Sequence, residues 1–520
     1  MVPTSNAELM ERAVERVATP YLVVDREGTT GLVEADAFDP GRIVGYLPAV
    51  RPECLGDESF RRDHGIRYAY VSGAMANGIG SVEIAQAMGR AGMLGVFGAA
   101  GLPLRKVEAA IDRLQGTVPH GFNLIHSPND PALESQVVDL YLSRGVRLVE
   151  ASAYLDLTLP VVRYRAKGLR RDSSGRVVAA NRVMAKISRV EVASKFLAPA
   201  PERFLNELVA SGEITPEQAS LAAEVPMADD LTAEADSGGH TDNQAAVVLL
   251  PTMLALRDRL QRQYGFRDAP RVGAAGGIST PWSAAASFAM GASYVVVGSV
   301  NQACVESGTS DLVRKMLAEA RQADIAMAPA ADMFEMGVKV QVLKRGTMFA
   351  MRASRLLDLY RAHDSIESIP AAERATLEKT VFKAPLEAIW DQTRAYFLDR
   401  DPAQAERAGR DPKHKLALVF RWYLGQSSHW ANAGDASRAV DYQVWCGPAM
   451  AAFNEWVKGS FLERPEERRV ATVAMNILYN ASVLIRARTL AAQGVALPAG
   501  VPRLAPLPLA EIEGRAVLLV

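Results

Sequence analysis

Between residues 66 and 300, short apolar runs alternate with longer amphipathic stretches. The apolar runs are rich in Val, Ile, Leu, Ala and Tyr and lack the polar alternation of a half-exposed strand, which is typical of buried parallel strands. Eight such runs lie at 68–74, 94–97, 121–125, 146–151, 183–187, 230–235, 272–275 and 294–297. The pattern therefore predicts an α/β protein with eight parallel strands.

Helical periodicity fills the intervals between these strands, for example at 81–90, 104–114, 133–144 and 245–264. Eight strand-helix units close into a (β/α)8 TIM barrel more naturally than into an open sheet, so we predict a barrel over 66–330. The interval 194–226 is too long for one crossover. Its two amphipathic segments, 201–210 and 216–223, predict a helical insertion.

The two ends of the chain do not continue the barrel pattern. Residues 1–65 predict an N-terminal extension: a short helix, a strand and turn over 21–28, and a connection through Pro40, Pro48 and Pro52. Residues 331–520 predict a mainly helical C-terminal region with a Trp-rich stretch at 422–456. These aromatic residues are typical of a helical core, while the region as a whole could also form a lid that binds substrate.

Composition removes several classes of function. The 520 residues include 58 basic and 59 acidic ones, so no overall charge favours nucleic acid or an anionic membrane. The three cysteines are far apart, which argues against a disulfide framework and a metal site. No signal peptide and no membrane-spanning run is apparent, so we expect a cytoplasmic protein.

Two glycine loops follow the seventh and eighth strands, where barrel proteins commonly hold phosphate. Gly276 and Gly277 precede a helix that starts at Pro281, and Gly298 and Ser299 follow the last strand. Glycines let backbone amides approach phosphate oxygens, although each loop alone could be simple turn geometry. A dinucleotide fingerprint is missing, because the Gly78-Ile79-Gly80 segment lacks its third glycine.

The sixth strand leads into Ser237-Gly238-Gly239-His240, which we interpret as a catalytic loop. Two glycines let the backbone approach a flat ligand while the imidazole points at its reactive face. The alternative is a surface turn with an incidental histidine. His240 is the candidate catalytic residue.

Other strand ends supply further candidates for the same rim. Ala74, Met75 and Asn77 follow the first strand, and Asn123 and Lys186 lie in the third and fifth. Each also has a structural interpretation: Met75 as core packing, Asn123 as a helix cap and Lys186 as an ion-pair partner. Their convergence at one barrel rim favours a binding site.

The chain resembles the trans-acting, FMN-dependent enoyl reductases of polyunsaturated fatty acid and polyketide synthases (PfaD type), within the wider group that includes nitronate monooxygenases. The segments that carry the resemblance are 72–80, 234–242, 276–278, 420–425 and 441–450. The barrel segments alone support the wider group, and the two C-terminal segments point to the synthase-associated branch.

The resemblance implies FMN, with its phosphate on Gly276, Gly277, Gly298 and Ser299. It places the flavin ring near Ala74, Met75, Asn123 and the 237–239 turn, and we add Asn77 and Lys186 to this cofactor site. It also places His240 beside the substrate. Shorter relatives often have Glu or Gln seven residues before this histidine, where Ala233 stands here, so Glu234 is the nearest candidate for a polar contact to the ring.

The leading hypothesis is an enoyl reductase that uses NADPH or NADH to reduce enoyl thioesters on an acyl carrier protein. A nitronate monooxygenase is the competing enzyme, and a flavin-free structural partner of a synthase is the third possibility. Lys344, Arg345 and Arg352 could meet an acidic carrier or the NADPH phosphate, or could simply be solvated. Monomer and homodimer both stay open.

Overall fold

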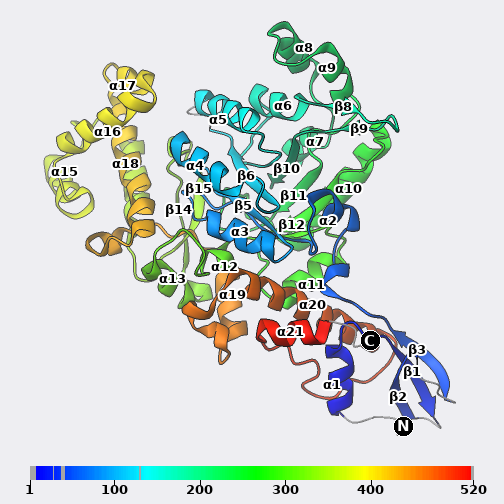
Figure 1. Ribbon diagram of the computed structural model, residues 1–520. Helices are drawn as coiled ribbons and strands as arrows, with labels where there is room; N and C mark the ends of the chain where they lie inside the picture. The colour runs from blue at the N-terminus through cyan, green and yellow to red at the C-terminus, as the bar shows by residue number, and fades with distance from the viewer. Residues whose placement is uncertain (1–6, 27–28, 37–40, 128–130, 517–520) are drawn as a thin grey trace.

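A computed structural model describes residues 7–26, 29–36, 41–127 and 131–516. Eight of the described strands form a closed parallel barrel in the order β10-β11-β12-β13-β4-β5-β6-β7 (Figure 1). Their bounds are β4 Tyr70–Ser72, β5 Leu94–Phe97, β6 His120–Ile125, β7 Leu148–Ser152, β10 Arg182–Ile187, β11 Asp230–Glu234, β12 Arg271–Ala275 and β13 Val295–Val297. The predicted barrel is confirmed. Pro40 and residues 27–28 of the predicted turn lie outside the described residues.

Helices surround the barrel. Four lie where the periodicity predicted them: α3 Val82–Arg90, α4 Leu104–Leu114, α5 Pro131–Ser143 and α10 Ala246–Tyr264. A fifth, α11 Pro281–Ala289, begins at the predicted Pro281, and the others are α6 Leu159–Ala166, α7 Val190–Phe196 and α12 Ser299–Gln302. The predicted insertion is also present, as α8 Glu202–Ala210 and α9 Pro216–Ala222. A small hairpin, β8 Arg170–Arg171 with β9 Val177–Val178, precedes β10.

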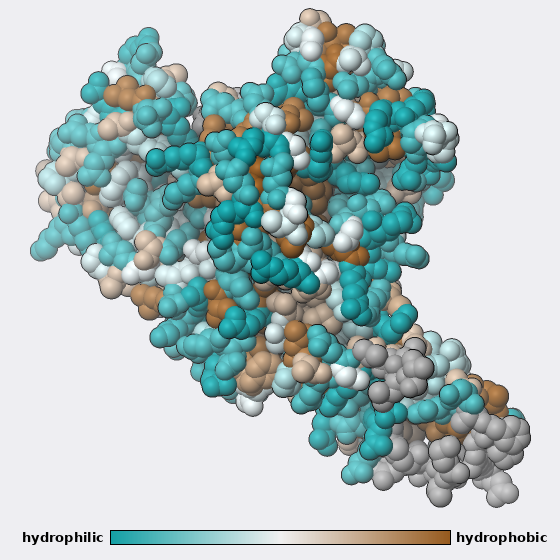
Figure 2. Space-filling model, viewed as in Figure 1, coloured by the Kyte–Doolittle hydropathy of each residue, from teal (hydrophilic) through white to brown (hydrophobic). Residues whose placement is uncertain are grey.

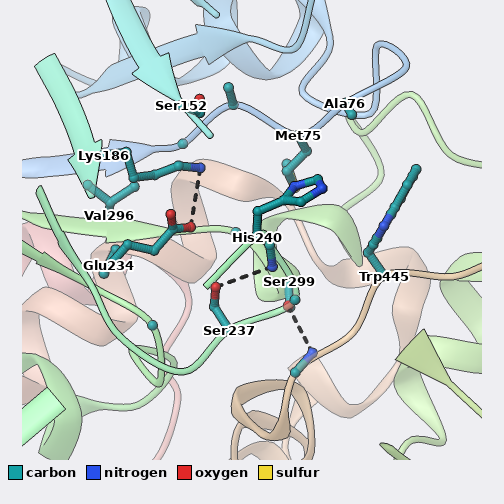
Figure 3. Close-up of a pocket in the computed structure, with 18 of the residues that line it drawn as sticks. Met75, Ala76, Ser152, Lys186, Glu234, Ser237, His240, Val296, Ser299 and Trp445 are labelled. Atoms are coloured by element: carbon teal, nitrogen blue, oxygen red, sulfur yellow. Dashed lines mark hydrogen bonds and ion pairs between the residues drawn. The ribbon is translucent and has the colours of Figure 1, made fainter. Parts of the chain in front are cut away.

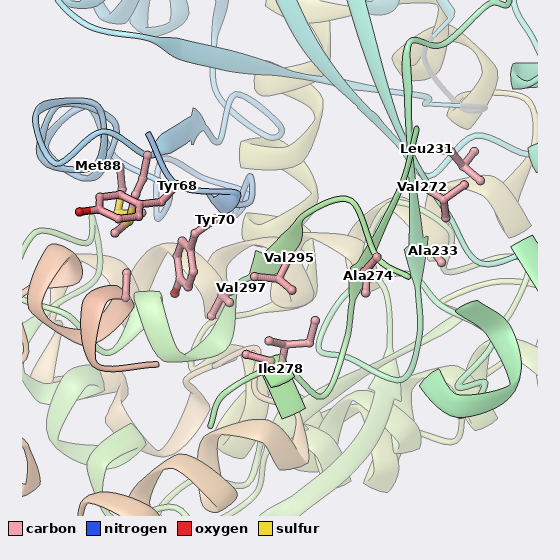
Figure 4. Packing of buried hydrophobic residues seen from close by; sticks show 14 of the residues in the cluster. Tyr68, Tyr70, Met88, Leu231, Ala233, Val272, Ala274, Ile278, Val295 and Val297 are labelled. Atoms are coloured by element: carbon pink, nitrogen blue, oxygen red, sulfur yellow. The ribbon is translucent and has the colours of Figure 1, made fainter. Parts of the chain in front are cut away.

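The strands bury both faces, which explains their continuous apolar runs. Successive side chains of β13 point to opposite sides: Val296 belongs to a cluster inside the barrel, whereas Val295 and Val297 pack outward under the helices. Figure 4 shows part of the outer layer, including Leu231 and Val272 from neighbouring strands. The barrel is therefore a filled core, and ligands can reach only its rim.

A buried ion cluster closes the amino ends of the barrel strands, opposite the rim. The Asp230 carboxylate, at the start of β11, accepts from Arg271 Nε at 2.6 Å and lies 2.7 Å from His64 Nε2 at the end of α2 (Glu58–His64). Burial alone would raise the pKa of Asp230, but His64 and Arg271 outweigh it and lower that pKa to about 2. This cluster serves stability, because the amino ends of barrel strands are remote from the site.

We predict that stability falls as pH drops below about 4, because a carboxylate with a depressed pKa contributes only while it is ionised. The shift from 3.8 to about 2 corresponds to about 2 kcal/mol of stability, which is present above pH 4 and lost towards pH 2.

The Asp230→Asn variant should lose this pH dependence, and its free energy of unfolding at pH 7 should fall by about 3 kcal/mol, since the substitution leaves buried cations unpaired. Urea unfolding at pH 7 and pH 3 measures both. Asp268→Asn, which breaks an exposed pair with Arg176, is the control and should change little; equal effects of the two variants would contradict the prediction.

Beyond the barrel, a hairpin and a helical arm extend to one side (left in Figure 1). The hairpin pairs β14 Ile325–Pro329 with β15 Lys339–Leu343, and the helices are α14 Phe349–Ala362, α15 Ala371–Leu377, α16 Leu386–Arg400, α17 Pro402–Ala408 and α18 Pro412–Ala433. These elements share a second core, against which Trp390, Trp422 and Trp430 pack. The helical-core interpretation of the 422–456 stretch is right for Trp422 and Trp430. The hairpin was not predicted.

The C-terminal helices return to the barrel and meet the N-terminal segment. They are α19 Pro448–Val457, α20 Val470–Ala492 and α21 Leu509–Ala516, with α13 Asp311–Ala318 between barrel and hairpin. The N-terminal elements are α1 Ala7–Glu15 and a sheet of β1 Tyr21–Arg26, β2 Thr29–Glu34 and β3 Arg42–Leu47. Arg486 of α20 is fully buried and donates to the Ala13 and Thr19 carbonyls at 2.7 and 2.8 Å. Arg486 thus fastens the N-terminal segment to α20.

Among the described residues, α20 is also the one helix long and apolar enough to cross a membrane. Within the molecule, 83% of its most apolar window is buried, and the helix carries the buried Arg486. A core helix satisfies the same criterion, so this signal is weak. The face of the molecule in Figure 2 is covered mainly by hydrophilic residues, with hydrophobic ones in small groups.

Candidate active site

One cavity lies at the carboxyl ends of the barrel strands and collects nearly all of the predicted site residues (Figure 3). Those that line it are Ala74, Met75, Asn123, Lys186, Ser237, Gly238, Gly239, His240, Gly276, Gly277, Gly298 and Ser299. Since these residues come from six different strand ends, only the closed barrel could bring them together.

Asn77 does not line the cavity. It has a left-handed backbone with φ 57°, and its side chain donates to Ser428 Oγ of α18 at 2.7 Å. The assignment of Asn77 to the cofactor site is therefore not supported by its position. It ties a rim loop to the helical arm instead.

The glycines of the two predicted phosphate loops have different surroundings. A Cβ at Gly276 would lie 2.6 Å from the Ala235 backbone, so this glycine is required by packing within the protein. A Cβ at Gly277 or Gly298 would meet no protein atom within 4 Å, although both residues line the cavity. The space beside these two backbones is thus left open, as a cradle for a phosphate requires.

A buried charge cluster forms the cavity floor. Lys186 Nζ lies 3.4 Å from Glu234 Oε1 and 3.7 Å from Glu150 Oε2. Burial opposes the charge on Lys186, but the two carboxylates outweigh it and raise the pKa of the lysine. Lys186 is therefore an ion-pair partner, as its structural interpretation predicted, and it also lines the cavity.

Glu150 was missed by the sequence interpretation. Burial raises the pKa of Glu150, although the positive charge of Lys186 opposes that rise. The Glu150 Oε2 atom accepts from Ala74 N at 2.9 Å, whereas Oε1 has no hydrogen-bond partner among the described residues. A charged residue between Val149 and Ala151, inside an otherwise apolar strand, was the available signal, because an ionised group is rarely buried unless it is paired.

His240 is paired with an acid from outside the barrel. Its Nε2 lies 3.1 Å from Asp332 Oδ1, in the loop between β14 and β15. Burial disfavours the charged imidazolium, but the Asp332 carboxylate outweighs it, and the pKa of His240 is raised. Nothing in the sequence around Asp332 indicated this contact, because it depends on a hairpin that was not predicted.

The C-terminal region completes the cavity wall. Val340, Trp445, Gly447 and Ala449 line the cavity together with the barrel loops, and Figure 3 shows the Trp445 indole on the same side of the cavity as the His240 ring. Gly447 N donates to Ser299 Oγ at 3.4 Å. The barrel rim and the C-terminal region therefore form one site.

The basic residues considered for docking have internal partners in two cases. Arg352 pairs with Asp441, whose side chain is fully buried. Arg345 lies 3.7 Å from Glu319 and 3.8 Å from Asp324. Arg352 is therefore a structural ion pair, and neither residue is an unoccupied docking charge.

Comparison with known families covers most of the chain. Residues 61–372 match the family model for nitronate monooxygenase. The chain belongs to the nitronate monooxygenase family. Residues 363–442, most of the helical arm, match the inserted helical domain of [acyl-carrier-protein] S-malonyltransferase. The family match spans the barrel and the hairpin, so it includes both His240 and Asp332.

Individual relatives show which members of this family the chain resembles. The chain is 50% identical to a polyunsaturated fatty acid synthase polypeptide of Thraustochytrium sp. (84% of this chain, 30% of the relative) and 45% identical to polyketide biosynthesis protein PksE of Bacillus subtilis (84% and 57%). It thus spans only 30% and 57% of these longer proteins. The crystal structure of the enoyl reductase domain of MlnA from the macrolactin cluster of Bacillus amyloliquefaciens is 39% identical, with a TM-score of 0.80, over 85% of this chain and 99% of that domain. The predicted resemblance to synthase-associated enoyl reductases is confirmed.

Proposed function

We propose that the protein is an FMN-dependent enoyl reductase that uses NADPH to reduce the α,β double bond of enoyl thioesters carried on an acyl carrier protein. The observation that carries the proposal is the cavity itself: a paired histidine, two open glycine loops and an apolar wall from the C-terminal region face one space. The similarity to an enoyl reductase domain over almost its full length supports it.

The residues of the rim fit a flavin mononucleotide. Gly277 and Gly298 leave room where a phosphate would lie, and Lys186 offers a cation on the cavity floor. FMN is favoured over FAD because the loops lie where a mononucleotide would end. When bound, the reduced flavin supplies hydride to the β-carbon, and NADPH is the reductant that restores it.

His240 is the group placed to complete the reduction. Its raised pKa favours the imidazolium near neutral pH, which can donate a hydrogen bond to the thioester carbonyl or give the proton that the α-carbon gains. Lys186 is less suited to this role, since two carboxylates hold its proton. The net reaction consumes NADPH and one proton and converts the double bond to a single bond.

The second candidate is nitronate monooxygenase activity, which the family model itself names. In that reaction histidine would act as a base on a nitroalkane. Burial opposes the charge on His240, but Asp332 raises its pKa and so favours the protonated ring, which cannot accept a proton until it has lost one. So small a substrate would also leave the wall of Val340, Trp445 and Ala449 unused. Both features favour the enoyl thioester.

The test is a two-step anaerobic experiment on the purified protein. The bound flavin is first identified as FMN or FAD after release, then reduced with NADPH or NADH in separate samples. Crotonyl thioester on a carrier protein or crotonyl-pantetheine is then added while flavin absorbance is followed. Reoxidation by the crotonyl thioesters supports the proposal, and a preference for the carrier-bound form supports the carrier protein as partner. A separate sample with oxidised flavin and no nicotinamide receives nitroethane in air. Oxygen consumption there, without reoxidation of the reduced flavin by the crotonyl thioesters, would assign the second candidate, and a colourless protein that binds no added FMN would refute both.

We predict that Trp445→Ala weakens the use of long acyl chains, since it removes an aromatic wall from the cavity. Loss of a buried aromatic contact is worth about 1.5–3 kcal/mol, or roughly 10- to 100-fold in kcat/KM. The loss should appear mainly in KM and should grow from a four-carbon to an eight-carbon enoyl substrate. Trp282→Ala, which removes a half-exposed surface tryptophan, is the matched control. An equal effect on both chain lengths would contradict an acyl-binding role.

A further inference from the structure

We propose that Asp332 is a positioning residue for His240, so that the hairpin outside the barrel supplies part of the reaction machinery. The inference rests on the proposed function for the reaction it affects. It goes beyond that function because it assigns a role to a residue of the C-terminal region. Asp332 is not itself a catalytic residue here, since it acts through the histidine.

The contact between the two residues joins separate parts of the fold. His240 follows β11 of the barrel, and Asp332 lies 92 residues later in the β14–β15 loop, with 3.1 Å between Nε2 and Oδ1. The His240 side chain is 25% exposed and that of Asp332 39%. The pair is therefore partly shielded from water, where an ion pair fixes both geometry and charge more strongly than at a free surface.

The loop that carries Asp332 is held firmly by the helical arm. Phe334 is fully buried, and its ring lies 5.3 Å from that of Tyr360 and 6.5 Å from that of Phe420. Glu335 Oε1 accepts from Arg421 of α18 at 3.2 Å. The loop is thus anchored immediately after Asp332, which fixes where the carboxylate meets the imidazole.

The other charges that face His240 are Glu234 and Lys186 on the cavity floor, and they act in opposite directions on its pKa. Of the three residues, Asp332 has the largest effect on the pKa of His240. Burial would raise the pKa of Asp332 itself, but the nearby His240 outweighs burial and lowers that pKa. Asp332 also holds the ring in place by accepting from Nε2. It leaves Nδ1 as the nitrogen available for a substrate, because one imidazole nitrogen is occupied by the carboxylate.

The test compares Asp332→Asn with Asp242→Asn in the protein as isolated. Asp242 is on the same loop as His240 but accepts from Arg189 Nε at 2.8 Å, so it controls for loss of a nearby negative charge. The His240 pKa is followed by NMR of 13C-labelled histidine, assigned with His240→Ala. In Asp332→Asn it should fall by about one unit or more. Asp242→Asn should leave it within a few tenths of a unit.

The kinetic readout is the pH profile of reoxidation by crotonyl thioester. Because the protonated histidine is the active form, the alkaline limb should move to lower pH in Asp332→Asn by the same amount as the NMR titration. The rate below that limb should fall about 10-fold or more, since the ring loses its orientation. Asp332→Glu keeps the charge and should restore most of the pKa, with a smaller rate defect from the longer side chain.

An unchanged His240 pKa in Asp332→Asn, or Asp332→Glu titrating like Asp332→Asn, would overturn the inference. The NMR arm needs no substrate, so it distinguishes this failure from failure of the proposed function. If the pKa falls as expected while no enoyl thioester is reduced, the pairing is real and the proposed reaction is wrong. Should Asp332→Asn fold poorly, Asp332→Ala removes the same carboxylate and must lower the His240 pKa, while Asp332→Glu must keep it; an unchanged pKa in Asp332→Ala would overturn the inference.

Discussion

The His240→Ala protein is expected to retain FMN and to be reduced by NADPH at close to the wild-type rate, yet to lose most of its reaction with enoyl thioester. The loss should be about 10²- to 10⁴-fold, the usual cost of removing an acid or polarising group. The reason is position: the imidazole follows the Ser237-Gly238-Gly239 turn and is paired with Asp332, so it belongs to neither of the two glycine loops assigned to the phosphate. Its absence should therefore leave cofactor binding intact.

Stopped-flow traces of flavin reduction and flavin reoxidation, recorded separately, measure the two halves of this prediction. His429→Ala is the control, because His429 is an exposed histidine of α18 that does not line the cavity. A His240→Ala protein that reoxidises at the wild-type rate would show that His240 is not catalytic. The proton would then have to come from water or from Lys186.

Gly298→Val is expected to abolish retention of FMN while leaving the folded protein stable. The new side chain would meet no protein atom within 4 Å at its Cβ, and the backbone φ of −115° lies outside the left-handed region, so little clash or strain arises within the protein. The methyl groups would instead fill the space assigned to phosphate. Gly277→Val should also lose FMN, but its φ of 73° adds backbone strain and makes that variant the less selective one.

Flavin absorbance per mole of protein and the thermal unfolding of the cofactor-free protein are the measurements. Gly514→Val in α21 is the matched control, because a Cβ there also meets nothing within 4 Å and the residue is exposed. Full FMN occupancy in Gly298→Val would place the phosphate elsewhere. Loss of FMN together with unfolding of the cofactor-free protein would contradict the physical reason offered here, which is a blocked phosphate and an intact fold.

The barrel could be predicted because its signals are local. Each strand is an apolar run bounded by polar or glycine residues, and the predicted 94–97 coincides with β5. The first strand was predicted too long, as 68–74, because Tyr68 and Ala69 continue the apolar run although the paired strand β4 begins only at Tyr70. The sixth strand was too long by one residue for the same reason. Apolar runs report burial, whereas strand bounds depend on hydrogen-bonded partners far away in the chain.

The cavity was predictable for the same reason, since the barrel rule places strand ends together. What could not be predicted came from outside that rule. Asn77 has the sequence context of a rim residue, yet its partner Ser428 lies 351 positions away. Asp332 belongs to a hairpin whose strands, at 325–329 and 339–343, pair with each other, and whose Val342 also forms a bridge with the distant Trp445. A contact between two regions that are predicted separately changes the hydrophobic periodicity of neither sequence, so it cannot be read from that pattern.

The helices α1, α20 and α21 are linked to one another by polar contacts. Arg515 Nη1 of α21 pairs with Glu15 of α1 at 2.6 Å, and the Tyr479 hydroxyl of α20 donates to the Glu15 carbonyl at 2.9 Å. In the described parts of the chain, none of α1, β1 to β3, α20 and α21 contributes a residue to the cavity wall. These elements therefore hold one another in place outside the cavity wall, so substitutions among them alter the stability of the fold without altering the surface that faces a ligand.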